Sequence, residues 1–228
     1  MRHREVSRLE AFSDAVFGFA LTLLVVSLET PKDFTALAGM MMNFVPFALT
    51  FAMVVWIWYE HNIFFRRYGL QDALTVFLNA VLLFVVLFYV YPLRFLTEAL
   101  INGLIFNRTD GLNITRNDSP LLMLFYSIGV LLVFTSFLLL YWRAWRLRST
   151  LDLDAVERLQ LIYRARSHGI SAGIAVVSLI LLAALPSQSM WAGIIYASMG
   201  PLHAWNGYRA GAAQARLERS KGPTVQRS

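Results

Sequence analysis

Long apolar blocks separated by short polar segments dominate the chain. A helix needs about 20 mainly apolar residues to cross a bilayer, and six blocks are close to or above that length. They cover residues 5–29, 37–64, 72–100, 120–147, 169–185 and 190–211. The pattern predicts an all-α membrane protein with six transmembrane helices in one domain, residues 1–213. The polar, basic segment 214–228 is expected to be a disordered tail.

Composition agrees with this class of protein. The chain is 57% hydrophobic and 15% charged, whereas soluble domains carry about 25% charged residues. A net charge of +6 would suggest nucleic acid as the partner of a soluble protein, but here the basic residues flank the apolar blocks. We therefore expect a lipid bilayer as the partner and no nucleic acid. The absence of cysteine excludes disulfides, thiolate metal sites and a cysteine nucleophile.

The basic residues also predict an orientation. Of the 20 lysines and arginines, sixteen lie before or at the start of the first block, between the second and third, at the end of the fourth or between it and the fifth, or at the end of the sixth or after it. The other four lie on the opposite side of the membrane in the predicted topology. Cytoplasmic loops carry the excess of such residues, so we expect a multi-pass protein with both termini in the cytoplasm. The basic N-terminus lacks a small-residue cleavage site, which favours a retained first helix over a signal peptide.

The first block contains the most informative polar residues. Ser13 and Asp14 lie just inside it, and an ionisable group at that depth usually faces a protein interior or a water-filled path. Residues three or four positions apart share one helix face. One such stripe consists of Phe12, Ala15, Phe19, Thr22 or Leu23, and Val26. The stripe either packs in a bundle core or lines a narrow pore, where apolar rings gate by dewetting and a hydroxyl replaces part of an ion's hydration.

The remaining polar residues favour a structural role. The four histidines have no metal-ligand spacing within a helix, and phosphate-loop, nucleophile-elbow and dinucleotide motifs are absent. We therefore expect no enzyme, no cofactor and no fixed metal. By the predicted topology His61 and Asn79 lie within reach of Asp14 or Ser13. A buried Asp-His-Asn or Ser-Asn hydrogen-bond cluster, with Arg8 as a counter-charge, would hold three helices in register.

These residues also carry a family resemblance. Arg8-x-x-x-Phe12-Ser13-Asp14, followed by a threonine-bearing apolar helix, resembles the signature of the transmembrane protein 175 family, the lysosomal potassium channels and their shorter bacterial relatives. The resemblance extends to Trp58-x-x-His61 with Phe64 in the second block, and to Asn79 and Pro92 in the third. Individual residues match over about the first 95 positions, and beyond them only the number and arrangement of the predicted helices match.

The resemblance implies a potassium-selective, leak-like channel of the prokaryotic plasma membrane. In that family single six-helix units form a homotetramer, and the first helix of each subunit lines the central pore without a carbonyl filter loop. The pore positions carried over are Phe19, Thr22, Leu23 and Val26. The network that holds the pore helix would be Arg8, Phe12, Ser13, Asp14, His61 and Asn79. Potassium ions would pass transiently, with no fixed metal site.

One position departs from the family pattern. The residue five positions after the aspartate is usually a branched aliphatic one, whereas this chain has Phe19. Our hypothesis is a pore that is closed or nearly closed at Phe19. Two alternatives stay open: a proton-coupled secondary transporter that uses Asp14 and His61 as a relay, and a non-conducting membrane scaffold. A transporter requires a pH gradient, whereas a channel passes ions without strict pH coupling.

Overall fold

Helices account for nearly all of the part of the chain that the computed structural model describes, residues 6–28, 30–105, 118–185 and 189–220. They are α1 (Arg8–Val26), α2 (Phe34–Met42), α3 (Phe44–Tyr68), α4 (Ala73–Leu100), α5 (Ser119–Arg146), α6 (Ala155–Ala184), α7 (Ser189–Ile194) and α8 (Met199–Ser220). A π-helical segment, Ile101–Ile105, extends α4, and a 3-10 segment, Ile195–Ser198, joins α7 to α8. The described ranges contain no strand, so the predicted all-α class is confirmed.

Five helices are long and apolar enough to cross a membrane: α1, α3, α4 with its extension, α5 and α6. The chain is therefore a multi-pass membrane protein. The expected sixth span, residues 190–211, is divided among α7, the 3-10 segment and α8. None of these three pieces is both long and apolar enough to be counted with the five, so a sixth crossing stays a prediction.

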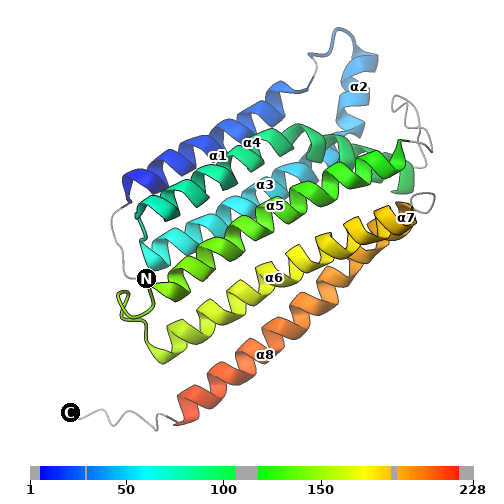
Figure 1. The fold of residues 1–228 in the computed structure, drawn as a ribbon. Coiled ribbons are helices and arrows are strands. Elements are labelled where there is room, and N and C mark those ends of the chain that lie inside the picture. The colour runs from blue at the N-terminus through cyan, green and yellow to red at the C-terminus, as the bar shows by residue number, and fades with distance from the viewer. Residues whose placement is uncertain (1–5, 29, 106–117, 186–188, 221–228) are drawn as a thin grey trace.

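The second apolar block is two helices instead of one. α2 ends at Met42 and α3 begins at Phe44, and the direction of the chain changes between them (Figure 1). The Oδ1 atom of Asn43, at the junction, accepts a hydrogen bond of 3.1 Å from the Asn102 amide. Pro46 lies in the first turn of α3, where a missing N–H costs nothing. α3 ends where Gly69 takes a left-handed conformation with φ of 57°.

Two other boundaries differ from the hydropathy pattern. α6 begins at Ala155, where Asp154 and Glu157 form a reciprocal capping box, and continues without a break through the fifth apolar block. α8 continues to Ser220, so the first part of the segment expected to be disordered is helical. Residues 221–228 of that segment, and residues 5 and 29 of the expected first span, lie outside the described residues.

The helices form a bundle in which α1 and α8 lie at opposite edges (Figure 1). α1 packs on α3 and α4, α4 and α6 pack on α5, and α8 packs on α6. Aromatic rings fill the centre: the ring centroid of Phe64 in α3 lies 5.0 Å from that of Tyr141 in α5 and 5.1 Å from that of Tyr68. Because α1 is at an edge, only part of its circumference is covered within the subunit.

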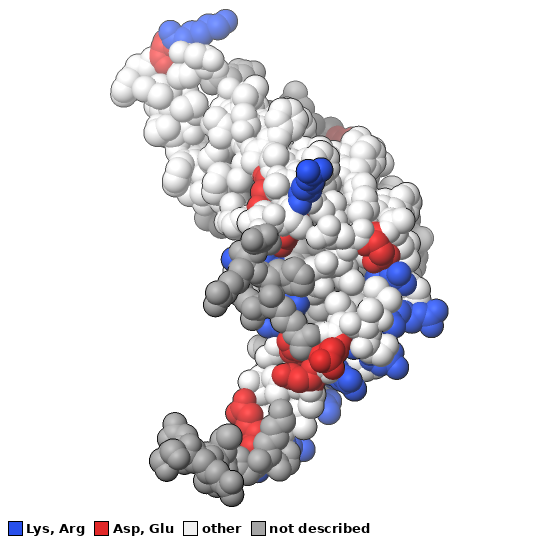
Figure 2. Space-filling view, turned by 90° about the vertical axis from the view of Figure 1, so that its left-hand side faces the viewer, with Lys and Arg blue, Asp and Glu red and all other residues white. Residues whose placement is uncertain are grey.

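Charged side chains gather at one end of the bundle. The last turns of α3 and α5 carry Arg66, Arg67, Arg143 and Arg146, and all four lie at the end where α1 begins. Figure 2 views the molecule from this end, and most of the Lys and Arg side chains visible there lie in the lower half of the view. The basic residues, which are unevenly distributed along the sequence, are therefore also unevenly distributed in space. The cytoplasmic assignment of this end stays a prediction.

Candidate functional site

α1 has one buried and one exposed face. The buried face consists of Ser13, Phe17, Ala20 and Leu24, which are at most 2% exposed. The opposite face carries the residues of the predicted stripe: Phe12, Phe19 and Val26 are 60%, 56% and 69% exposed, and Ala15 and Thr22 are also exposed. Leu23 is half-buried and lies at the border of the two faces. The stripe is therefore not packed in the core of the subunit.

The exposed face carries one hydroxyl among apolar groups. Thr22 Oγ1 donates a hydrogen bond of 2.9 Å to the carbonyl oxygen of Gly18, one turn earlier on α1. This bond uses the hydroxyl proton and leaves the oxygen lone pairs free to contact a cation. A Cβ built at Gly18 would meet nothing within 4 Å inside the subunit. The helix surface beside Phe19 is thus accessible from outside the subunit.

On the buried face a directed chain of hydrogen bonds joins α1 to α4 and α3. The Ser13 hydroxyl donates to the carbonyl oxygen of Leu9 at 2.8 Å and accepts from the Asn79 amide at 2.9 Å. Asn79 Oδ1 lies 2.8 Å from His61 Nε2. Since the amide oxygen can only accept, His61 carries its proton on Nε2. All three side chains are at most 1% exposed, so the chain fixes the register of three helices.

Asp14 is held separately. Trp58 Nε1 donates a hydrogen bond of 2.7 Å to Asp14 Oδ1, and the carboxylate is half-buried. Sequence reasoning treated Trp58 as part of the family pattern and did not name it as a site residue. The available signal was its spacing: Trp58 and His61 are three positions apart and so share the face of α3 that meets α1.

Two residues of the expected network lie elsewhere. Arg8 is exposed in the first turn of α1, and no hydrogen bond or ion pair joins it to the network within the described ranges. Phe12 lies on the exposed face with Phe19. The subunit thus brings Ser13, Asn79 and His61 together, and pairs Asp14 with Trp58.

The beginning of α1 is fixed by a capping box. Ser7 Oγ accepts from the Glu10 backbone N–H at 3.2 Å, and Glu10 Oε2 accepts from the Ser7 N–H at 2.8 Å. Glu10 is 9% exposed, and it places a carboxylate in the first turn, where the helix dipole favours negative charge. Together with the bonds of Ser13 and Asp14, this arrangement allows α1 little freedom to rotate about its axis.

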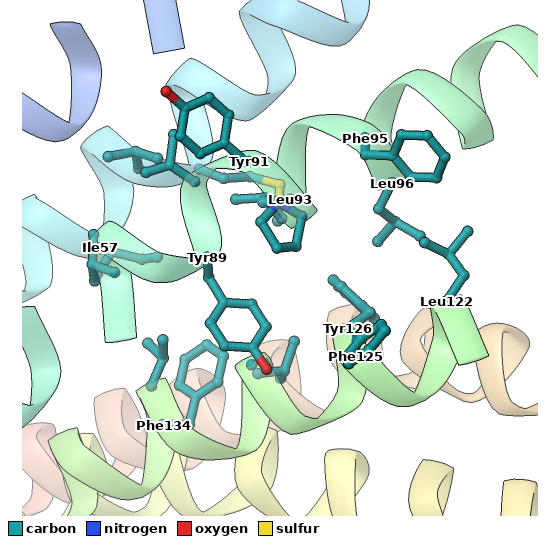
Figure 3. Close-up of a pocket in the computed structure, with 18 of the residues that line it drawn as sticks. Ile57, Tyr89, Tyr91, Leu93, Phe95, Leu96, Leu122, Phe125, Tyr126 and Phe134 are labelled. Carbon is teal, nitrogen blue, oxygen red and sulfur yellow. The ribbon is translucent and has the colours of Figure 1, made fainter. Parts of the chain in front are cut away.

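A second candidate site is an apolar cavity of about 700 Å³ near Pro92 of α4. Figure 3 shows aromatic and aliphatic side chains around it, among them Tyr89, Phe125, Leu93 and Phe134, from α4 and α5. Two of its polar side chains, Ser171 and His203, are hydrogen-bonded to each other at 2.9 Å. Such a lining offers little to replace the hydration shell of an ion. In the described residues no group of three His, Asp or Glu side chains could hold a metal ion.

Comparisons by sequence match the region that holds this network. The family model described as endosomal/lysosomal potassium channel TMEM175 matches residues 8–89, which contain α1, α3 and much of α4. A protein named potassium channel from Marivirga tractuosa is 45% identical over 163 residues, which are 68% of this chain and 66% of that protein. The matched region thus spans just under two thirds of that relative's length.

Comparisons by structure extend over the whole bundle. A crystal structure of a variant of the potassium channel MtTMEM175 has a TM-score of 0.81 and 36% identity, and the match covers 92% of this chain and 96% of that one. A lysosomal potassium-selective channel TMEM175 homolog from Chamaesiphon minutus has a TM-score of 0.60 at 20% identity, covering 91% and 99%. The second likeness concerns the fold alone.

Proposed function

The chain belongs to the TMEM175 family, and from this premise we propose that it is a potassium channel in which the exposed face of α1 lines the central pore of a homotetramer. The observation that carries the proposal is the asymmetry of α1. One face is held by buried hydrogen bonds to α3 and α4, while the other exposes a stripe of apolar side chains with one hydroxyl. Four copies facing a common axis would enclose that stripe.

The cavity beside Pro92 supports a path between subunits over a path through one subunit. Its mainly aromatic and aliphatic lining would leave a dehydrated potassium ion with few partners. The exposed face of α1, by contrast, offers the Thr22 oxygen, and water can occupy a central space between four helices. The sequence has no carbonyl filter motif, so this pore would conduct in a leak-like manner.

Phe19 is the proposed constriction. Its side chain is 56% exposed and lies one turn from Thr22 on the same face. Four rings at one level would narrow the path and exclude water, which is how an apolar constriction closes a pore. Ring faces turned toward the axis would attract a cation by about 0.5–2 kcal/mol each. In this proposal Thr22, Leu23 and Val26 continue the lining toward the end of α1.

The hydrogen bonds support a channel over a proton relay. Asp14 and His61 bind different partners, Trp58 and Asn79, and the His61 proton is engaged by an amide oxygen. Those bonds suit a fixed scaffold for the pore helix. We propose potassium ions, the bilayer and further copies of this chain as its partners, and the plasma membrane of a prokaryote, with both termini cytoplasmic, as its location.

Flux into liposomes that contain the purified protein tests the proposal. We expect potassium-driven flux above sodium-driven flux, without any need for a pH gradient, and we expect Phe19→Ala to increase it. Ile180→Ala is the matched control, because Ile180 in α6 is 59% exposed but lies far from α1. If correctly assembled tetramers of both the wild type and Phe19→Ala pass no potassium, a non-conducting scaffold is favoured. Equal effects of the two substitutions would remove Phe19 from the ion path.

A further inference from the structure

The far end of α1 is held by a cation from another helix. The last turn of α1 has no basic residue of its own, and Ser27 caps it. Ser27 Oγ donates to the carbonyl oxygen of Leu24 at 2.7 Å, so its lone pairs are available to accept. Arg94 of α4 donates from Nη1 to this same oxygen. The guanidinium therefore lies at the C-terminal end of α1, where the helix dipole places partial negative charge.

Arg94 occupies a polar cavity next to that helix end. The cavity has a volume of about 980 Å³, and its charged lining residues are Lys32, Asp33, Arg94 and Glu98. It differs from the apolar cavity beside Pro92, because water and ions can fill it. Arg94 lies two positions after Pro92 on α4 and is half-buried, whereas Lys32 is exposed. Of the two cations, Arg94 is the one bonded to α1.

We propose that Arg94 determines how readily cations enter the pore from the C-terminal end of α1. The inference rests on the proposed function, in which four α1 helices surround the path. Their C-terminal ends would attract cations, and four guanidinium groups fixed beside them oppose that attraction. Arg94 thus acts on the entering cations through its charge. Its effect is electrostatic, so it falls as salt shortens the Debye length from about 30 Å at 0.01 M to about 3 Å at 1 M.

Three substitutions separate charge from geometry. Arg94→Gln keeps hydrogen-bond donors but removes the charge. Arg94→Lys keeps the charge. Lys32→Gln removes a cation from the same cavity for which the described residues show no hydrogen bond or ion pair to α1, and so serves as the matched control. Single-channel recording of each purified tetramer in a planar bilayer, with potassium entering from the C-terminal end of α1, gives the readout, and size-exclusion chromatography verifies the assembly.

We expect Arg94→Gln to raise the potassium current from that side about two- to fivefold at about 0.02 M salt and to leave it unchanged at about 1 M salt. Arg94→Lys and Lys32→Gln should stay near wild type at both salt concentrations. The inference is overturned if Arg94→Gln has no salt-dependent effect, or if Arg94→Lys changes the current as much as Arg94→Gln does. An assembled wild-type tetramer without any current would instead overturn the proposed function.

Discussion

The ring of Tyr89 in α4 lies against the backbone of Gly129 in α5. A Cβ at position 129 would be 2.2 Å from Tyr89 Cε1 and 2.9 Å from Cζ, distances that side chains do not adopt. Tyr89 also lines the apolar cavity beside Pro92, where Figure 3 shows its ring directed toward α5. The absence of a side chain at position 129 is thus what lets the two helices meet at this level.

Gly129→Ala should therefore destabilise the bundle. Displacing the Tyr89 ring costs about 1–3 kcal/mol, as other overpacked cores do, and better helix propensity offsets up to about 1 kcal/mol of that cost. The unfolding midpoint in detergent measures the net effect. Gly173→Ala is the matched control, because a Cβ there meets nothing within 4 Å, and this change should be neutral or stabilising. If both variants unfold at the same temperature, the close approach of Tyr89 and Gly129 does not limit packing.

Ser13→Ala should cost about 1–3 kcal/mol, because it leaves the buried Asn79 amide without an acceptor. Ser136 of α5 supplies the control. Its hydroxyl also donates to the carbonyl four residues earlier and it is 4% exposed, but no buried amide depends on it. Ser136→Ala should shift the free energy of unfolding by less than about 0.5 kcal/mol. Chemical denaturation of both variants measures the difference, and equal losses would show that the bond to Asn79 contributes little.

Part of this arrangement could be predicted from sequence because it follows local rules. Ser13 and Phe19 fall on different faces of α1 because six positions at 3.6 residues per turn leave their side chains roughly 120° apart around the helix axis. Buried intramembrane polar side chains need hydrogen-bond partners where water is absent, so the sequence suggested that Asn79 pairs either with Ser13 or with Asp14 and His61. The structure joins Asn79 to both Ser13 and His61. The all-α class followed from the apolar blocks alone.

The rest depends on contacts that no local pattern contains. Hydropathy is continuous across Asn43, so a window average cannot detect the boundary between α2 and α3. The first half of α6 is amphipathic, and hydropathy alone placed the start of the span after it although the helix is continuous. The partners of Asp14 and Ser27, which are Trp58 and Arg94, come from other helices, and only the packing angles of those helices select them.

Asp14→Asn should distinguish a channel from a proton relay. An asparagine oxygen can still accept from Trp58 Nε1, so the anchoring of α1 persists while the charge and the titratable proton are lost. In a channel we expect potassium flux to fall by no more than about two- to threefold, through weaker attraction of cations. A relay would lose transport driven by a pH gradient altogether. Liposome flux with and without that gradient measures both, and Trp58→Phe, which removes the donor, shows what loss of the anchor alone does.

The pair of Asp72 and Arg143 should make stability depend on pH. Partial burial acts to raise the pKa of the Asp72 carboxyl, but hydrogen bonds from the Thr75 hydroxyl, at 2.6 Å, and from Arg143 outweigh it and hold the pKa below its ordinary value. Arg143 Nη2 lies 3.0 Å from Asp72 Oδ2. A carboxyl whose pKa is lower in the folded state contributes stability above its unfolded pKa of about 3.9 and loses it as the pH falls through the folded value.

We therefore expect Asp72→Asn to lower the free energy of unfolding by up to about 1 kcal/mol at neutral pH, because both partners are partly exposed. The difference from wild type should shrink below about pH 4 and disappear below the folded pKa of Asp72. Denaturant titrations of both proteins at neutral and acidic pH measure it. A loss in Asp72→Asn that is the same at neutral pH and at about pH 3 would mean that packing at the start of α4, and not the charge of Asp72, stabilises the bundle there.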